Sequence, residues 1–375
     1  MKHVLFVSKP IVPPWHDGSK NLVRDIATHL TRARPTVMTT ERAAPLGGRV
    51  VSDPLYREPG GFSPSVLTNA RVMRRLLSDR AHDVWHFVFA PNVASSAAAR
   101  VSIATRRALG WNGQVVQTIA SAPRRFELAP SLLFGDAVVA LTEWTRARLL
   151  AEGIDGSKLR VIPPCSIPPR AVSPAEIAQL REELDLGSGP ILVYPGDYEV
   201  SHGAETVARA AAAIVRAVPE ARIVFACRPK TARAAEARTH VEHILADAHL
   251  GQNVLHRTRH VGQMADIVPL LAAASAVLFP VDDLYGKVDL PIVLLEALAL
   301  GIPMVLARGG PLEALSAADF VEPGDADALA RTAVAILRDA GDPNRAQHAR
   351  ALYAERFTPA TVAARYDELY EQLRR

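Results

Sequence analysis

The chain has 375 residues, of which 49% are hydrophobic and 22% charged, and its formal net charge is +4. This length exceeds one ordinary core and fits two domains. Only two cysteines, Cys165 and Cys227, occur, which excludes a disulfide-rich scaffold and fits a reducing cytoplasm. The apolar run at 267–281 is interrupted by Pro269 and is shorter than the roughly 20 residues that span a bilayer. We therefore expect a cytoplasmic protein without a membrane span.

The charge is unevenly distributed along the chain. Residues 1–168 carry 22 Lys and Arg against 12 Asp and Glu, or +10, and the remaining 207 residues carry 21 against 27, or −6. One interpretation is that the first half meets an anionic partner, such as a phosphorylated acceptor or the inner membrane surface. The other is that arginines are scattered over solvated helices. Nucleic acid is the least expected partner, because no aromatic residues are interleaved with the best candidate patch, Arg71, Arg74, Arg75 and Arg80.

Strand and helix patterns alternate through the first half, which predicts parallel βα units. Strands are predicted at Val4–Val7, Val84–Val88, Val115–Thr118 and Ala137–Leu141, and helices at Gly18–Leu30 and Glu143–Glu152. A segment with four prolines follows at 161–170. Proline excludes a helix there and makes a stiff connection. We place the domain boundary in this segment, giving a first domain at 1–168 and a second at 169–357.

The second half begins with a capping-box pattern, Ser173 and Glu176 around Pro174. Strands are predicted at Ile191–Tyr194, Arg222–Ala226, Ala276–Phe279 and Met304–Ala307. The tail at 358–375 opens on Thr358-Pro359 and carries one apolar stripe, which predicts a helix that packs across both domains. The predicted fold class is α/β, with two Rossmann-like domains facing a central cleft.

Residues 285–313 carry the strongest functional signal. Glu296 opens the helical stretch EALAL, which stops at Gly301, and the strand Pro303–Ala307 then leads to Gly309-Gly310 and Glu313. The carboxyl edge of an α/β sheet is where such folds bind phosphorylated ligands. One carboxylate can accept hydrogen bonds from both hydroxyls of a ribose diol. We therefore predict the donor side of a nucleotide site here.

Several segments taken in order resemble a known enzyme family. They are PPWHDGSKN, DVWHFVFAPN and VVALTEWTRARLLAEGI in the first half, and LVYPGDYEVSHG, the 285–313 block and PGDADALARTAVAIL in the second. The chain resembles the retaining GT-B glycosyltransferases of family 4. The resemblance implies a GT-B fold, a nucleotide-sugar donor in the second domain and an acceptor, of glycan, lipid-linked or small-molecule type, in the first. No cofactor is implied beyond the donor.

The resemblance also implies individual donor-binding residues. Glu296 matches the second glutamate of the family's E-x7-E motif, which grips the donor ribose. Gly18 and Ser19, at a helix start, would face the diphosphate. The donor side would also include Gly196 and His202 after the first strand of the second domain, and Leu290 and Pro291 in the 285–313 block. For Gly18 the alternative is an ordinary turn before a helix.

The first glutamate of that motif is replaced by Val288. Lys287 and Asp289 flank it and are the candidate catalytic groups, because Lys287 would neutralise diphosphate charge and Asp289 would accept from sugar hydroxyls. The alternative is that the two residues pair with each other on a loop, an interaction that is worth little when exposed.

The diphosphate clamp also departs from the family pattern. Asp197 stands where an arginine is expected and His202 where a lysine is expected. Arg228 and Lys230, after the next strand, are the candidate replacements, although arginine's planar fork and lysine's point charge are not equivalent. Alternatively, both are solvated loop residues. No metal is expected, because Asp282-Asp283 lacks cation-ligand spacing.

A family histidine is missing as well, since its position is occupied by Ala120. His86, placed at the end of another first-domain strand, matches a second family histidine and is the third candidate catalytic residue. The alternative is a satisfied structural histidine. His16 is a weaker candidate. A mechanism in which the leaving phosphate takes the acceptor proton tolerates these losses.

Three functions compete at this point. The first is a glycosyltransferase of glycan or glycolipid biosynthesis. The second is a catalytically impaired nucleotide-sugar binder with the same fold, suggested by Val288, Asp197 and Ala120. The third, a dinucleotide oxidoreductase, is disfavoured because the first βα turn has no G-x-G-x-x-G.

Overall fold

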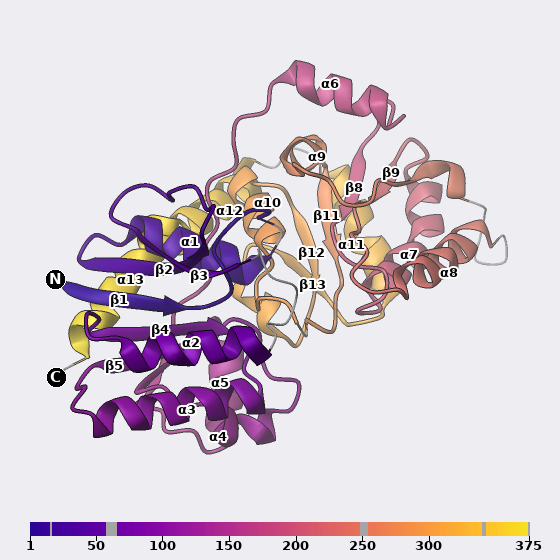
Figure 1. The fold of residues 1–375 in the computed structure, drawn as a ribbon. Coiled ribbons are helices and arrows are strands. Elements are labelled where there is room, and N and C mark those ends of the chain that lie inside the picture. The colour runs from indigo at the N-terminus through magenta and orange to yellow at the C-terminus, as the bar shows by residue number, and fades with distance from the viewer. Residues whose placement is uncertain (16, 58–65, 248–253, 285, 340–342, 374–375) are drawn as a thin grey trace. The chain divides into compact units, whose positions relative to one another are not determined.

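The fold was analysed in a computed structural model, which describes residues 1–15, 17–57, 66–247, 254–284, 286–339 and 343–373. The chain forms two compact units (Figure 1). Unit 1 contains residues 1–167, 285–292 and 356–375, and unit 2 contains 168–284 and 293–355. Residues 285–292 thus group with unit 1, although the sequence analysis placed them in the second domain. No helix among the described residues is long and apolar enough to cross a membrane.

Unit 1 is built on a seven-stranded parallel sheet in the order β3-β2-β1-β4-β5-β6-β7. Its strands are β1 (Lys2–Val7), β2 (Ala33–Thr40), β3 (Val51–Tyr56), β4 (Val84–Phe89), β5 (Gln114–Ile119), β6 (Ala137–Ala140) and β7 (Leu159–Val161). Its helices are α1 (Gly18–His29), α2 (Val66–Ser78), α3 (Val93–Ala108), α4 (Ala129–Leu132), α5 (Glu143–Ala151) and α13 (Pro359–Gln372), with a 3-10 turn at Phe126–Leu128.

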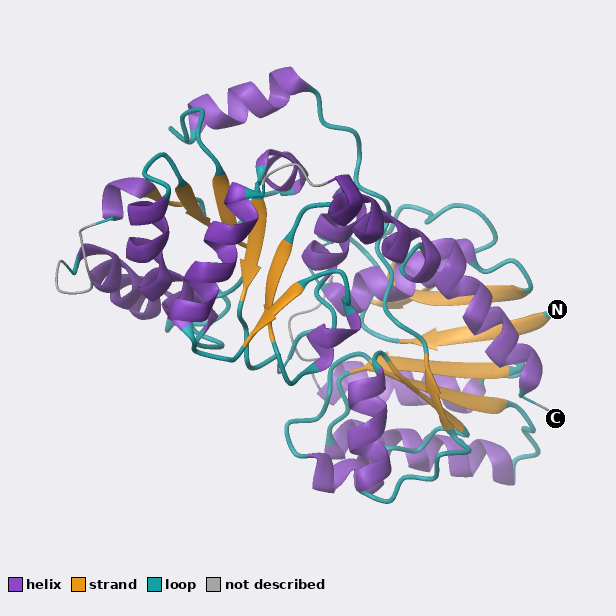
Figure 2. Cartoon of the chain, turned by 180° about the vertical axis from the view of Figure 1, so that it is seen from behind, coloured by secondary structure: helices purple, strands orange, loops and turns teal. Residues whose placement is uncertain are grey.

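Both faces of this sheet are covered by helices (Figure 2). Side chains alternate along a strand, so Val4 and Phe6 of β1 belong to one core and Leu5 and Val7 to another. The first core is closed by α1 and α13, and the second by α2 and α3. Burial on both faces is what makes the central strands continuously apolar.

Unit 2 holds a six-stranded parallel sheet in the order β10-β9-β8-β11-β12-β13. Its strands are β8 (Ile191–Tyr194), β9 (Arg222–Phe225), β10 (Thr258–His260), β11 (Ala276–Phe279), β12 (Met304–Ala307) and β13 (Asp319–Val321). Its helices are α6 (Pro174–Glu183), α7 (Gly203–Ala217), α8 (Ala234–Ala246), α9 (Val268–Ala273), α10 (Ile292–Leu300, starting at the junction with unit 1), α11 (Ala326–Arg338) and α12 (Pro343–Arg356), with 3-10 turns at Leu255–Arg257 and Pro311–Ala314.

The predicted α/β architecture with two parallel sheets is confirmed, and three strands of the second sheet match their predicted bounds residue for residue. The capping box at Ser173 and Glu176 is present, and Thr358 caps α13. One boundary was wrong: α10 begins at Ile292, so Glu296 lies inside the helix and does not open it. The four apolar residues before Glu296 can continue the helix, and the sequence pattern did not exclude them.

Candidate functional site

His86 is an interior residue of unit 1. It lies in the middle of β4, and its side chain is completely buried. Its Nδ1 is 2.7 Å from the Tyr370 hydroxyl of α13, and its Nε2 is 2.7 Å from Thr118 Oγ1 of β5. Burial lowers the pKa of His86 to about 3. The strand-end position predicted for His86 is therefore wrong. Through these two contacts the His86 ring connects α13 to the sheet. This is the role of a structural histidine, which was the alternative to a catalytic one.

The start of α1 is closed by its own cap. Asp17 Oδ1 accepts hydrogen bonds from the backbone N–H groups of Ser19 (2.9 Å) and Lys20 (3.3 Å). Asp17 Oδ2 is 2.7 Å from the Lys9 ammonium. Burial alone would raise the pKa of Asp17, but the hydrogen bonds from Lys9 and Ser19 outweigh it and lower the pKa to about 2. The Asp17 carboxylate therefore accepts from the same Ser19 N–H that was expected to bind the diphosphate.

Gly18 is in contact with Val288. A Cβ atom at Gly18 would lie 2.4 Å from Val288 Cγ2, so only glycine fits against this valine. Val288 is buried in the same core as α1 and α13. Val288, which replaces the family glutamate, therefore packs against Gly18 in an apolar contact within unit 1.

Asp289 connects the segment before α10 to the start of α5 by hydrogen bonds. Its Oδ2 accepts hydrogen bonds from the hydroxyls of Thr142 (2.9 Å) and Thr145 (2.6 Å), and the carboxylate is 2% exposed. Burial raises the pKa of Asp289 in spite of these two bonds. Nearby, the Gly286 N–H donates to Ser121 Oγ at 3.1 Å. The structure thus places Asp289 in the interior with two threonines as partners, and not on a loop open to a sugar.

The other candidates of this segment differ in exposure. Lys287 is half-buried, Leu290 is completely buried, and Pro291 is half-buried immediately before α10. Leu290 therefore contributes packing and offers no side-chain surface to a ligand. The half-buried Lys287 is an accessible cation in the described part of this segment.

In unit 2, Asp197 pairs with Arg228 and Lys230, the two residues that were predicted to replace the family's diphosphate-binding cations. Asp197 follows β8, is 2% exposed, and lies 3.2 Å from Lys230 Nζ through Oδ2 and 4.0 Å from Arg228 Nε through Oδ1. The two cations follow β9, the strand that pairs with β8. An aspartate alone would repel a diphosphate, but here it holds Arg228 and Lys230 at the carboxyl edge of the sheet.

The neighbouring loop leads into α7. A Cβ at Gly196 would lie 2.3 Å from the Tyr194 ring, so this glycine is required by packing. His202 precedes the first residue of α7, and its ring Nδ1 is 3.1 Å from Asp282 Oδ2. The hydrogen bond with Asp282 raises the pKa of His202. Because Asp282 follows β11, this pair joins the loops of the two strands at which the order of the sheet reverses.

Glu296 is a half-buried carboxylate in α10. No residue in the described part of the chain donates a hydrogen bond to it. Burial raises the pKa of Glu296 to about 7, and the negative charge of Asp266 adds to the effect. An unpartnered carboxylate of this kind is costly for stability, and such residues are concentrated at functional sites.

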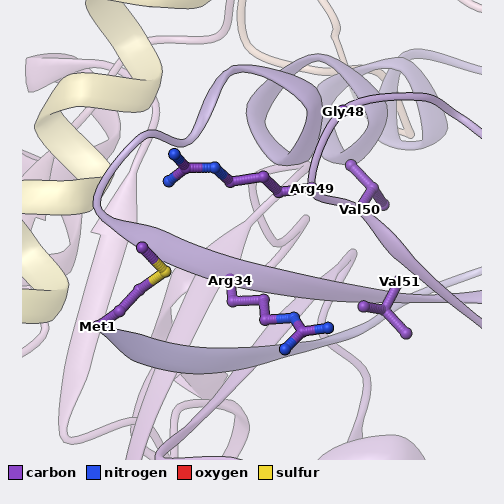
Figure 3. Close-up of a pocket in the computed structure, with 6 residues that line it drawn as sticks. All are labelled: Met1, Arg34, Gly48, Arg49, Val50 and Val51. Atoms are coloured by element: carbon purple, nitrogen blue, oxygen red, sulfur yellow. The ribbon is translucent and has the colours of Figure 1, made fainter.

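A separate hollow lies at the opposite edge of the unit 1 sheet (Figure 3). It is lined by Met1, Arg34, Gly48, Arg49, Val50 and Val51. These residues precede or begin β1, β2 and β3, whereas ligands of such sheets bind outside the carboxyl ends of the strands. We therefore do not assign this hollow to the donor.

Sequence reasoning missed three features of these sites. The cap at Asp17 was readable as an Asp before a helical pattern. Asp282 was considered only as half of an acidic pair without cation-ligand spacing. Lys20 was not singled out, but it is 7% exposed, burial lowers its pKa, and no described residue pairs with its ammonium. The pairing of Asp282 with His202 joins two different loops, and the burial of Lys20 is set by tertiary packing, so no local pattern reveals either.

Two family models cover most of the chain. "Glycosyltransferase Family 4" matches residues 16–165, and "Glycosyl transferases group 1" matches residues 189–339. The chain belongs to the group 1 glycosyltransferases. It is a glycosyltransferase with the GT-B fold, as the resemblance implied. No curated protein sequence matches the chain.

Solved structures agree on the fold of this glycosyltransferase. Anabaena Alr3699/HepE in complex with UDP-glucose is 17% identical, with full coverage of both chains and a TM-score of 0.74. The same protein in complex with UDP has a TM-score of 0.75. Sucrose-phosphate synthase from Thermosynechococcus elongatus is 20% identical, covering 100% of this chain and 99% of its own, with a TM-score of 0.73.

Proposed function

We propose that the protein transfers a sugar from a nucleoside diphosphate sugar to an acceptor hydroxyl with retention of configuration. The observation that carries the proposal is Glu296, a half-buried carboxylate without a hydrogen-bond donor among the described residues, on the helix that the family uses for the donor ribose. Family membership and the UDP and UDP-glucose complexes of a protein with the same fold support a uridine nucleotide as the first donor to test. The acceptor would bind to unit 1.

The ribose diol would supply the hydrogen-bond donors that Glu296 lacks. An ionised carboxylate can accept from both hydroxyls, and this interaction favours the charged form that burial disfavours. Binding of a nucleotide would therefore lower the pKa of Glu296 from about 7 and release protons near neutral pH. The part of this proton release that is lost in Glu296→Ala is a signature that a purely structural glutamate would not give.

The diphosphate would bind at the start of α7. The N-cap residue His202 makes no side-chain cap bond, and Ser201 Oγ accepts only from the Gly203 N–H, at 3.2 Å. The N–H groups of the next two residues and the helix dipole are then offered to an anion. Arg228 and Lys230 are held nearby by Asp197. His202, whose pKa is raised by Asp282, adds a protonated donor at lower pH. Asp197 would then position Arg228 and Lys230, whereas the family has an arginine at this place that binds the diphosphate directly.

The chemical step needs no protein base in this scheme. The bond between the anomeric carbon and the diphosphate oxygen breaks, and a bond from the acceptor oxygen forms on the same face. The acceptor proton passes to the leaving phosphate oxygen. The protein stabilises the departing negative charge and positions the acceptor. The buried His86 and the alanine at 120 are compatible with this scheme, which also requires no metal ion.

The second candidate function is a nucleotide-sugar binder without turnover. The contact between Val288 and Gly18 favours it, because a valine buried in a core cannot supply the carboxylate that the family places there. Nucleotide binding through Glu296 would persist in such a protein, and only the transfer step would be lost.

One experiment separates these functions. Isothermal titration with UDP, GDP and ADP in two buffers of different ionisation enthalpy measures affinity and proton release, and mass spectrometry measures donor hydrolysis and transfer to extracted acceptors. We expect UDP to bind with proton release and Glu296→Ala to weaken it at least tenfold. The matched control is Glu182→Ala on an exposed position of α6. Binding without hydrolysis or transfer would favour the second candidate. Unchanged affinity in Glu296→Ala would remove the ribose assignment.

A further inference from the structure

The outer face of α3 is apolar. A helix on the surface of a soluble protein normally presents polar residues to water. In α3, the large side chains Val93 and Val101 and the following Leu109 are 60%, 58% and 67% exposed. The other exposed positions on this side are mostly small and apolar: Ala94, Ala97, Ala104 and Ala108. No acidic residue occurs anywhere in α3.

Helix α2 packs beside α3 on the same side of the sheet (Figures 1 and 2) and adds positive charge. Leu67 and Leu77 of α2 are 74% and 37% exposed, and α2 also lacks acidic residues. No described residue forms an ion pair with Arg71, Arg74 or Arg80 at this face. Arg75 is different, because it pairs with Asp53 at 2.6 Å and Asp79 at 3.2 Å. The patch predicted from sequence is therefore reduced to three arginines, which border the apolar side chains.

We propose that this α2–α3 face docks on the surface of an anionic lipid bilayer. Exposed apolar side chains beside unpaired basic ones are the composition with which helices lie in the interface of a membrane. The bilayer offers the complementary charge, and each arginine near an anionic surface strengthens binding about fivefold. The face belongs wholly to unit 1, and the inference does not depend on the nucleotide-sugar proposal.

Charge argues against a second copy of the chain as the occupant. A twofold interface places the same patch on both partners, so the unpaired arginines of one copy would lie near those of the other. Like charges buried at an interface are costly. Three carboxylates of unit 1, Asp53, Asp79 and Asp136, are already paired with Arg75 and Arg107, so they do not compensate.

Flotation of the full chain with two kinds of vesicle tests the proposal. One vesicle contains phosphatidylcholine alone, and the other contains phosphatidylcholine and phosphatidylglycerol. We expect binding to the anionic vesicle that weakens with added salt. The double variant Arg71→Gln, Arg74→Gln should bind about thirtyfold more weakly. The matched control is Arg331→Gln, Arg338→Gln, which removes the same charge from exposed positions of α11 in unit 2.

A second pair of variants tests the apolar part. Val101→Asp should reduce binding at least as strongly as the arginine variant, whereas Leu255→Ser, at a 40% exposed leucine of unit 2, should not. Thermal unfolding shows whether each variant is folded. Equal binding to both vesicles, or no effect of the arginine variant, would overturn the proposal. Sedimentation without lipid that reveals a dimer lost in Val101→Asp would assign the face to self-association instead.

Discussion

In each unit the first strand of the sheet leads into a helix, α1 in unit 1 and α7 in unit 2, but the two helices begin in different ways. At α1, the Asp17 carboxylate accepts from two backbone N–H groups and pairs with Lys9, and Val288 covers Gly18. At α7, His202 makes no side-chain cap bond, Ser201 Oγ accepts from the Gly203 N–H at 3.2 Å, and the pair of cations on Asp197 lies in an adjoining loop. Asp17 thus holds the N–H groups of Ser19 and Lys20 at α1, whereas no described side chain accepts from the second and third N–H groups of α7.

Two carboxylates, Asp17 in unit 1 and Glu296 in unit 2, differ in the direction of their pKa shifts. The pKa of Asp17 is lowered to about 2 because its partners outweigh burial. The pKa of Glu296 is raised to about 7 because burial is not offset by any partner. A satisfied group stabilises the fold, and an unsatisfied one is retained where function needs it. This difference agrees with the proposal that the nucleotide binds to unit 2.

The largest expected effect concerns the cations of unit 2. Arg228→Ala with Lys230→Ala should weaken UDP binding by at least about 100-fold, since charge-assisted hydrogen bonds contribute about 1.5–3 kcal/mol each. Asp17→Ala in unit 1 should change UDP affinity less than about threefold. Isothermal titration measures both. Adding Asp197→Asn to the double variant removes the carboxylate left without its cations. A large loss of affinity in Asp17→Ala would reverse the assignment of the two helix starts.

A larger side chain at position 18 should destabilise the protein, because it would overlap with Val288. Gly18→Ala should lower the free energy of unfolding by about 1–3 kcal/mol, because its Cβ has no room beside the valine. Adding Val288→Ala should recover part of this loss by making space. Urea denaturation of both variants and of Val288→Ala alone completes the cycle. Simple additivity of the two changes would show that the side chains do not meet.

Glu296 should make stability depend on pH. Its raised pKa means that the folded protein binds the proton more tightly, so stability falls as pH rises from about 4.5 to about 7. Glu296→Gln removes the penalty and should be more stable than the natural protein by about 1–3 kcal/mol at pH 8, with little difference at pH 4.5. Urea unfolding at several pH values is the measurement. Parallel stability curves would show that the carboxylate is satisfied.

The smallest effect is expected at His202. Its pKa is raised by Asp282, so the pair contributes at pH values below the histidine's ordinary pKa and is lost as pH rises through the raised value. The side chain is 76% exposed, and such pairs contribute no more than about 0.5 kcal/mol. Asp282→Asn should shift the NMR titration of the His202 ring to lower pH. An unshifted titration would mean that the two side chains do not interact in solution.

Much of the fold could be predicted because its signals are local. The strand Ile191–Tyr194 is a short apolar run, the helix at Pro174 has a capping box, and α1 has its apolar residues at helical spacing. The family could also be identified from segments in order along the chain. The start of α10 was missed because four apolar residues fit a helix and a buried loop equally well.

The candidate site was less predictable, because its chemistry depends on partners that are distant in sequence. The sequence by itself determined that Glu296, Arg228, Lys230 and Asp197 are present, that Val288 replaces a carboxylate, and that the first half is basic. Only the tertiary structure decided that Asp197 holds the two cations, that Asp289 binds threonines of α5, and that His86 is buried under the C-terminal helix. A residue type fixes which interactions are possible, but burial and the arrival of a partner from another strand decide which of them form.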